Sequence, residues 1–193
     1  LHLKDKYYIF YHRQTNRSSY ARQACAEEIE MRQDGSFVQA EITSCGMNGK
    51  PLAGLGRYEA RIACNLWSKN GTGRYDCKNP RKLLAEHPYF TQDKKDGDAT
   101  AVQYIANMRD GAVAGFKYFD IQELKSASIE IRGKANGRML ISSDETFENV
   151  LTEIEISESE NVWHEVSGEI RETKKQEKHS SALFFKYVGN GAI

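Results

Sequence analysis

Short runs of alternating apolar and polar residues recur along this chain, and no stretch carries a convincing amphipathic helix of three turns. The clearest run is 150–156, where Val150, Thr152, Ile154 and Ile156 alternate with Leu151 and two glutamates. A period of two places successive side chains on opposite faces of a strand. The pattern therefore predicts an all-β fold built from antiparallel strands.

Seven such runs fall in the second half of the chain. They span 102–106, 115–121, 126–132, 138–142, 150–156, 162–166 and 182–188. In two of them one face is apolar, with Ala127, Ile129 and Ile131 in the first and Leu183, Phe185 and Tyr187 in the second. Many short strands joined by polar turns are typical of a β-sandwich or jelly roll.

The first third of the chain also predicts strands. Residues 7–11 read as a buried strand, and Asp34-Gly35 is a strong hairpin-turn dipeptide between two alternating runs. We expect that hairpin to bury one face, formed by residues 29 and 31 before the turn and 38, 40 and 42 after it. Residues 46–56 hold four glycines and a proline, which predicts a loop. We expect an N-terminal unit at 1–67, a linker at 68–83 and a β-sandwich at 84–193.

Charge and composition exclude several classes of protein. The 27 basic and 27 acidic residues cancel, whereas nucleic-acid binders and polybasic membrane-surface proteins carry a basic excess. Aromatic residues make up 10% of the chain, enough for a core. No apolar run reaches the ~18–20 residues that span a bilayer. We therefore expect neither a nucleic-acid nor a membrane partner.

Motifs for common chemistries are absent from the sequence. It has no phosphate-binding glycine loop, no G-x-S-x-G and no H-E-x-x-H. Cys25, Cys45, Cys64 and Cys77 are 20, 19 and 13 residues apart, unlike the short spacing of a zinc knuckle. They are predicted to be buried or idle thiols, with a disulfide as the alternative.

One acidic loop has ligands that suit calcium. Asp93, Asp96 and Asp98 fall within six residues around Gly97, and calcium prefers hard oxygen ligands. The spacing is not that of an EF-hand. Two predictions stay open, an ordinary turn and a loop that binds a structural calcium ion.

The N-terminal segment resembles a known enzyme family. Residues 7–16 (YYIFYHRQTN), 19–27 (SYARQACAE) and 60–66 (ARIACNL) are similar to the last blade of a glycoside hydrolase family 43 enzyme and the segment that follows it. The family comprises five-bladed β-propellers, including β-xylosidases, α-L-arabinofuranosidases and arabinanases. The resemblance covers residues 1–67 and implies that they are antiparallel strands from a propeller blade.

The remainder resembles a family 6 carbohydrate-binding module, a β-sandwich often fused behind such propellers. The matching segments are 115–119 (GFKYF), 129–133 (IEIRG), 161–163 (NVW) and 184–190 (FFKYVGN). The final strand that the family has after Asn190 is not in this chain, so the sandwich is expected to be truncated there. Some modules with this fold hold a structural calcium ion.

The two resemblances imply candidate site residues. His12 and Arg13 end an apolar strand that in a propeller runs toward the central pocket, so they are predicted to bind substrate. Tyr118, Trp163 and Asn190 are predicted to bind carbohydrate, with two aromatic rings around a sugar and an amide on its hydroxyls. The catalytic Asp, Asp and Glu of family 43 lie on earlier blades, so no catalytic residue is expected in this chain.

These expectations give one main hypothesis. The chain is the C-terminal part of a polysaccharide-degrading glycosidase that binds a neutral plant-type oligosaccharide or polysaccharide and packs against the parent's earlier blades. In the alternative, the sandwich only braces the propeller and binds no glycan. The chain starts without Met and reads as a piece of a longer protein. Secretion or export to the periplasm is expected for that parent.

Overall fold

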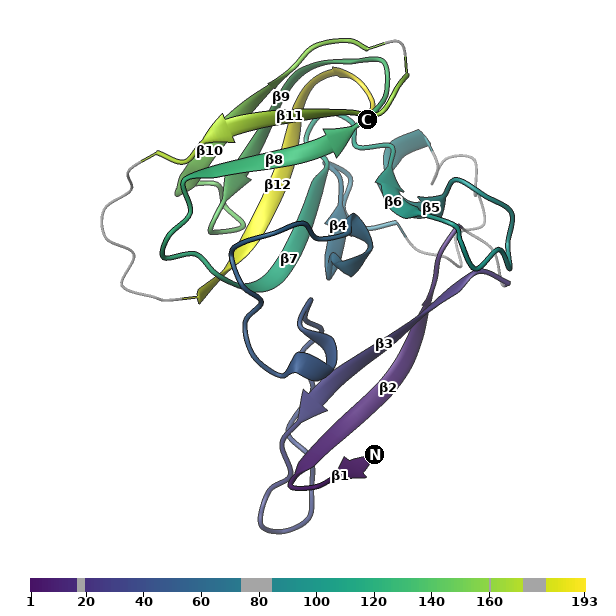
Figure 1. The fold of residues 1–193 in the computed structure, drawn as a ribbon, viewed down its shortest axis with the longest axis vertical. Coiled ribbons are helices and arrows are strands. Elements are labelled where there is room, and N and C mark those ends of the chain that lie inside the picture. The colour runs from purple at the N-terminus through teal and green to yellow at the C-terminus, as the bar shows by residue number, and fades with distance from the viewer. Residues whose placement is uncertain (17–19, 74–84, 160, 172–179) are drawn as a thin grey trace.

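The computed structural model describes residues 1–16, 20–73, 85–159, 161–171 and 180–193, and its regular secondary structure is almost entirely β-strand. A β-sandwich forms the upper part of the molecule in Figure 1, and a long antiparallel hairpin extends below it. The prediction of an all-β fold with antiparallel strands is confirmed. In the part of the chain that is described, no helix is long and apolar enough to cross a membrane.

The N-terminal sheet has three strands. β1 (His2–Leu3), β2 (Lys6–Gln14) and β3 (Arg22–Ile29) lie in that order and pair antiparallel. The register pairs residue 7 with residue 29 and residue 14 with residue 22, so β2 and β3 are partners over their whole length. This pairing confirms a strand at 7–11, but the prediction that it is buried is wrong, since Ile9 and Phe10 are exposed.

The hairpin predicted at Asp34-Gly35 is shorter than expected. Gly35 takes a left-handed φ of 84°, and the backbone bonds between Arg32 and residues 35 and 36 close the turn. Beyond it only one isolated bridge forms, between Met31 and Phe37. The expected strand at 38–42 is absent, and Ile42 is half exposed. The predicted buried face is therefore wrong, because the chain after residue 38 leaves the hairpin to contact the sandwich.

Five strands form the larger sheet of the sandwich. Their order is β10-β9-β12-β7-β4, and every neighbouring pair is antiparallel. The strands are β4 (Asn65–Trp67), β7 (Val113–Asp120), β9 (Ala135–Ser142), β10 (Val150–Ile156) and β12 (Ser180–Gly191).

Two smaller pairs complete the sandwich. β8 (Ser126–Ile131) pairs with β11 (His164–Glu169), and β5 (Tyr89–Gln92) pairs with β6 (Gln103–Ala106). Two 3-10 turns, η1 (Gly46–Asn48) and η2 (Ala60–Ile62), interrupt the segment before β4. Each of the seven strands predicted after residue 100 is present, and β5 is a strand that the sequence pattern did not predict.

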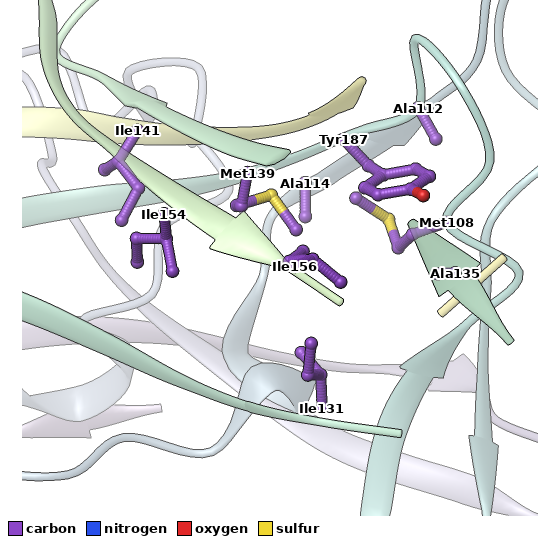
Figure 2. Close-up of a cluster of buried hydrophobic side chains, with 10 residues drawn as sticks. All are labelled: Met108, Ala112, Ala114, Ile131, Ala135, Met139, Ile141, Ile154, Ile156 and Tyr187. Atoms are coloured by element: carbon purple, nitrogen blue, oxygen red, sulfur yellow. The ribbon is translucent and has the colours of Figure 1, made fainter. Parts of the chain in front are cut away.

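The hydrophobic core lies between the larger sheet and the β8–β11 pair (Figure 2). It contains Met108, Ala112, Ala114, Ile131, Ala135, Met139, Ile141, Ile154, Ile156 and Tyr187. Ala127 and Ile129 pack against this cluster beside Ile131, as do Leu183 and Phe185. The apolar faces predicted for these two strands are therefore the core-facing ones.

Strand pairing crosses the predicted domain boundary at residue 67. β4 hydrogen-bonds to β7 of the sandwich, and Leu52 forms a parallel bridge to Phe119. Residues 44–67 therefore contact the sandwich rather than the N-terminal sheet alone. The division into 1–67, 68–83 and 84–193 as separate units stays a prediction. Most of the predicted linker lies outside the described residues.

Candidate functional site

Three side chains form a compact cluster at one end of the sandwich. The ring centroids of Tyr104 and Trp163 are 5.2 Å apart, with an interplanar angle of 83°. The Arg132 guanidinium carbon lies 4.9 Å from the centroid of Trp163 and 5.1 Å from that of Tyr104. Arg132 Nη2 also donates to the Tyr104 hydroxyl at 2.6 Å. Two aromatic rings and one cation therefore make up this aromatic–arginine cluster.

Strand ends bring the cluster together. In the β8–β11 ladder Ile131 pairs with His164, so Arg132 directly follows one strand and Trp163 directly precedes its partner. Tyr104 comes from β6, which lies beside that end of the sandwich (Figure 1). Trp163 stays 38% exposed. The end of the sandwich therefore presents an aromatic surface to solvent.

Asn190 lies at the same end. It pairs with Asn136 near the end of β12, and Ala192 N–H donates to the carbonyl of Lys134, two residues from Arg132. The Asn190 backbone carbonyl accepts a 2.5 Å hydrogen bond from the buried Tyr187 hydroxyl, while the residue itself is exposed. The structure thus brings Trp163 and Asn190 to one end, as the sequence predicted.

Tyr118 lies at the opposite end of the larger sheet. The β12–β7 register pairs Ser181 with Phe119, nine residues before Asn190 along β12. At ~3.3 Å per strand residue this separation is about 30 Å. The structure therefore does not bring Tyr118 together with Asn190. Tyr104, which the sequence pattern did not indicate, is the aromatic residue beside Trp163.

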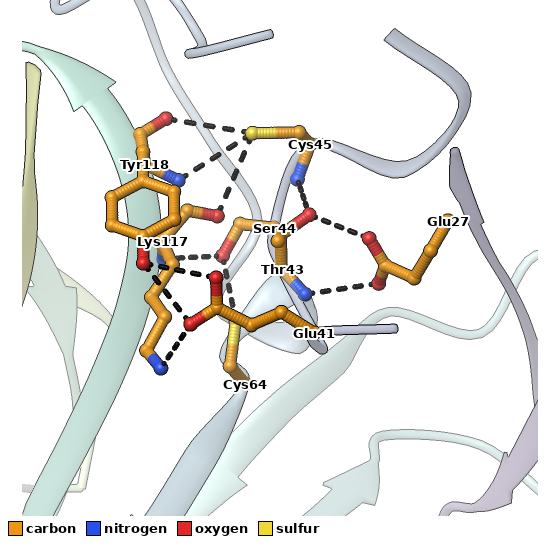
Figure 3. Close-up of polar contacts among 8 residues, drawn as sticks. All are labelled: Glu27, Glu41, Thr43, Ser44, Cys45, Cys64, Lys117 and Tyr118. Carbon is orange, nitrogen blue, oxygen red and sulfur yellow. Dashed lines mark hydrogen bonds and ion pairs between the residues drawn. The ribbon is translucent and has the colours of Figure 1, made fainter. Parts of the chain in front are cut away.

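Tyr118 belongs to a polar junction between the sandwich and the N-terminal segment (Figure 3). Its hydroxyl donates to the carboxylate of Glu41, with both oxygens at 3.0 Å, and Lys117 Nζ donates to the same carboxylate at 2.9 Å. The hydrogen bond from Lys117 is the main cause that lowers the pKa of Glu41. Burial, followed by the bond to Glu41, raises the pKa of Tyr118. The junction thus fixes this ring by its polar end.

Backbone and side-chain bonds extend the junction in both directions. Lys117 N–H donates to Ser44 Oγ at 3.0 Å, and Ser44 N–H donates back to the Lys117 carbonyl. On the other side, Glu27 of β3 is 4% exposed and accepts from Thr43 N–H at 2.9 Å and from its hydroxyl at 2.6 Å. Residues 41–45 therefore connect β3 to β7.

Arg13 makes contacts within the chain. Its Nη1 and Nη2 donate to the carbonyls of Ala63 and Arg61, its Nε donates to Gln23, and its guanidinium lies 4.1 Å over the Phe90 ring. Burial lowers its pKa. Arg13 therefore ties β2 to the turn before β4.

His12 is exposed and contacts Arg22 through Nε2 at 2.6 Å. Substrate contact by either His12 or Arg13 stays a prediction.

The three aspartates proposed for calcium each bind nearby polar groups. Asp93 Oδ1 accepts from Val102 N–H, Asp96 Oδ1 from the Asn16 side chain and Asp98 Oδ1 from the N–H and hydroxyl of Thr100. Across the described ranges no group of three or more His, Cys, Asp or Glu side chains could hold a metal ion. A calcium ion bound by these three aspartates stays a prediction.

Three of the four cysteines fall in described segments and carry free thiols, namely Cys25, Cys45 and Cys64. Burial raises the pKa of Cys25 and of Cys64, which keeps both protonated and unreactive at neutral pH. All three agree with the prediction of idle thiols. Cys77 lies outside the described residues.

No protein-family model matches the chain. The chain is 42% identical over 190 residues to a "Xylosidase/arabinosidase" of Thermoclostridium stercorarium, a match that covers 98% of this chain and 38% of that protein. The chain therefore spans well under half the length of this relative.

Solved structures share the fold, and two of them show its two parts. The first is a glycoside hydrolase family 43 arabinoxylan arabinofuranohydrolase from Bacillus subtilis in complex with cellotetraose, with TM-score 0.55 and 14% identity over 97% of this chain and 36% of that one. The second is CsCBM6-3 from Clostridium stercorarium in complex with cellobiose, with TM-score 0.52 and 12% identity over 75% of this chain and 92% of that one.

The fold is thus that of a family 6 carbohydrate-binding module preceded by further β-structure. The sequence similarity to the xylosidase/arabinosidase extends through the N-terminal segment as well as the sandwich. The expected resemblance to a family 43 glycoside hydrolase and to a family 6 module is confirmed as a similarity of fold, and the similarity in sequence is to a xylosidase/arabinosidase.

Proposed function

We propose that this chain is the C-terminal part of a polysaccharide-degrading glycosidase of the β-xylosidase or α-L-arabinofuranosidase type, and that its sandwich binds the polysaccharide. The observation that carries the proposal is the 42% identity to a xylosidase/arabinosidase over 98% of the chain. Because that match covers only 38% of the relative, we place the catalytic carboxylates in the remainder of the parent protein. The chain alone then binds glycan without cleaving it.

The aromatic–arginine cluster supports the binding role. Sugar rings present C–H faces that pack on aromatic rings, while their hydroxyls bond to polar groups at the rim. Trp163 offers an exposed ring, and Asn190 offers an exposed amide at the same end of the sandwich. Because Tyr104 and Trp163 are nearly perpendicular, we expect a sugar to stack on the open part of Trp163 rather than between two parallel rings.

The N-terminal sheet supports the link to a propeller. Ile9 and Phe10 are consecutive in β2, so they lie on opposite faces of the sheet, and they are 42% and 52% exposed. Leu3 and Phe37 are 50% and 49% exposed nearby. A propeller blade packs between two neighbouring blades and buries both faces. We therefore propose that the parent's preceding blades cover this sheet.

A second role is supported by the polar junction. Glu27, Glu41 and Lys117 fix the sandwich to the segment after β3 through several short hydrogen bonds. A sandwich held in this way can brace a propeller without binding glycan. Binding measurements separate the two roles.

The test of the proposed function uses the whole chain. Stacking on one exposed ring with a few hydrogen bonds that compete with water gives roughly 4–6 kcal/mol, so calorimetry with neutral xylan- or arabinan-derived oligosaccharides should give a Kd of about 0.1–1 mM. Binding should depend little on salt. No hydrolysis of aryl xylosides or arabinofuranosides is expected above a boiled control. Absence of binding to every oligosaccharide would leave the bracing role.

A further inference from the structure

We propose that the aromatic–arginine cluster recognises an acidic sugar, a uronic acid unit carried on the oligosaccharide, through Arg132. This inference rests on the proposed function, since it names the ligand class of the same site. The neutral chain of the glycan contacts the aromatic rings, and the carboxylate of the uronic acid pairs with the guanidinium. The site then prefers glycans that carry an acidic substituent over neutral glycans.

The first observation is that Arg132 has no acidic partner within the described segments. Four cations on or beside the sandwich do pair with carboxylates: Arg57 with Glu130, Lys69 with Asp110, and both Arg138 and Arg171 with Glu153. Arg132 instead contacts two aromatic rings and one hydroxyl. Its positive charge is therefore not balanced by a carboxylate of this part of the chain.

The second observation is that the guanidinium is held in place. The Tyr104 hydroxyl fixes Nη2, and both rings contact the planar group. Arginine carries five N–H donors in a rigid fork, and one bond to Tyr104 leaves a donor pair for a carboxylate. A pre-ordered arginine loses little side-chain entropy when it pairs. Recognition of a carboxylate therefore needs no rearrangement of Arg132.

The third observation is that the Arg132 guanidinium lies next to the exposed ring. Trp163, the exposed ring of the cluster, is 4.9 Å from the Arg132 guanidinium carbon. A sugar that stacks on this ring brings its substituents close to the guanidinium. Aromatic rings contribute apolar contact to any sugar, whereas an arginine distinguishes a carboxylate from a hydroxymethyl group. The cluster thus combines general sugar binding with selection for an acidic unit.

The experiment compares two ligands that differ in one group. The first is a xylo-oligosaccharide that carries one glucuronic acid, and the second is the same oligosaccharide after reduction of the carboxylate to the alcohol. With the whole chain at low salt, calorimetry should give about three- to tenfold tighter binding of the acid, as for a partly exposed hydrogen-bonded ion pair. In 0.5 M NaCl the difference should shrink.

Two variants assign the preference to one residue. Arg132→Gln should remove the preference for the acid while the reduced oligosaccharide still binds. Lys134→Gln removes the same charge from an exposed lysine two residues away and should keep the preference. Thermal melting of both variants checks that they remain folded.

Three results would contradict the inference. Equal affinity of the wild-type chain for the two ligands overturns it and leaves the proposed function in place. An equal loss in both variants shows a general charge effect and overturns it too. Failure of both ligands to bind, together with failure of the neutral xylan- and arabinan-derived oligosaccharides, removes the proposed binding role and leaves the bracing role.

Discussion

Glu27 accepts hydrogen bonds from both the backbone N–H and the hydroxyl of Thr43, although its side chain is almost completely buried. The same carboxylate also accepts a 3.0 Å bond from the Tyr11 hydroxyl. A buried carboxylate is tolerated only where such donors surround it. The hydrogen bonds between Glu27 and Thr43 therefore hold the chain at the point where it leaves the N-terminal sheet and turns toward the sandwich.

The first prediction concerns this carboxylate. Glu27→Gln keeps the volume of the side chain but places an amide N–H₂ opposite a donor, so it should lower the free energy of unfolding by about 1–3 kcal/mol. Urea unfolding measures the loss, and hydrogen exchange of the Thr43 amide should become faster.

A matched control is the neighbouring Glu28→Gln. Glu28 forms an exposed pair with Lys6 at 2.8 Å, and exposed pairs contribute roughly 0–1 kcal/mol. We expect little change in stability from this variant. If both variants had equal effects, net charge rather than the Thr43 bonds would explain the result for Glu27.

The second prediction is a pH dependence of the junction. The bond to Lys117 lowers the pKa of Glu41, so the stability that Glu41 contributes is present above its ordinary pKa and is lost as the pH falls through the lowered value. The same bond raises the pKa of Lys117, whose contribution is present below 10.5 and is lost as the pH rises through the raised value. The junction should be strongest between about pH 5 and 10.

Variants at two exposed carboxylates test this window. Glu41→Gln should reduce the acid-side loss of stability by up to about 1 kcal/mol, because Glu41 is half exposed and its pair is screened by solvent. Glu30→Gln removes an exposed carboxylate that has no ion pair in the described segments. This variant should lose as much stability at low pH as the wild-type chain. Urea unfolding from pH 3 to pH 7 gives the comparison. If Glu41→Gln lost as much stability between pH 7 and pH 3 as the wild-type chain, the junction would not explain the loss of stability in acid.

The alternation of apolar and polar residues predicted the strands of the sandwich well, because these strands bury one face and expose the other. In β8 and β12 one face packs on the core, so the apolar positions repeat with period two and can be recognised without any partner strand. The segment after Phe37 carries the same period, yet it forms no strand, because contacts with Lys117 and Tyr118 hold residues 41–45. Such contacts are 70 or more residues apart, and periodicity contains no information about them.

The structure brings together part of the predicted site. Trp163 and Asn190 lie at one end of the sandwich, whereas Tyr118, predicted as the second ring, lies at the junction, and Tyr104 is the ring beside Trp163. Sugar binding by Trp163 and Asn190 stays a prediction. Both tyrosines lie in predicted strands, so the sequence alone does not show which of them lies near Trp163. The strand register does, because it places Tyr118 at the end of β12 opposite to Asn190. Arg132 was missed because a cation at the end of a strand is ordinary until its partners are known.

The third prediction concerns the bond that fixes Asn190. Tyr187 is fully buried and its hydroxyl donates to the Asn190 carbonyl. Tyr187→Phe should lower the free energy of unfolding by about 1–2 kcal/mol, because a part-buried carbonyl loses its donor. Tyr58→Phe removes a similar bond, to the Ala53 carbonyl, at an exposed position and should cost less than about 0.5 kcal/mol. Thermal melting of the two variants in parallel measures the difference, and equal losses would contradict the structural role of Tyr187.

The last prediction decides which aromatic residue binds sugar. Trp163→Ala should stay folded, because a side chain 38% exposed leaves no closed cavity, and should weaken binding of a neutral xylo-oligosaccharide at least about tenfold. Tyr118→Leu removes the other candidate ring and should bind as well as the wild-type chain. Melting is measured first and calorimetry second. A loss of about 3–5 kcal/mol of stability in Trp163→Ala would instead place Trp163 in the core and favour the bracing role. Weak binding by Tyr118→Leu with normal binding by Trp163→Ala would move the site to the junction.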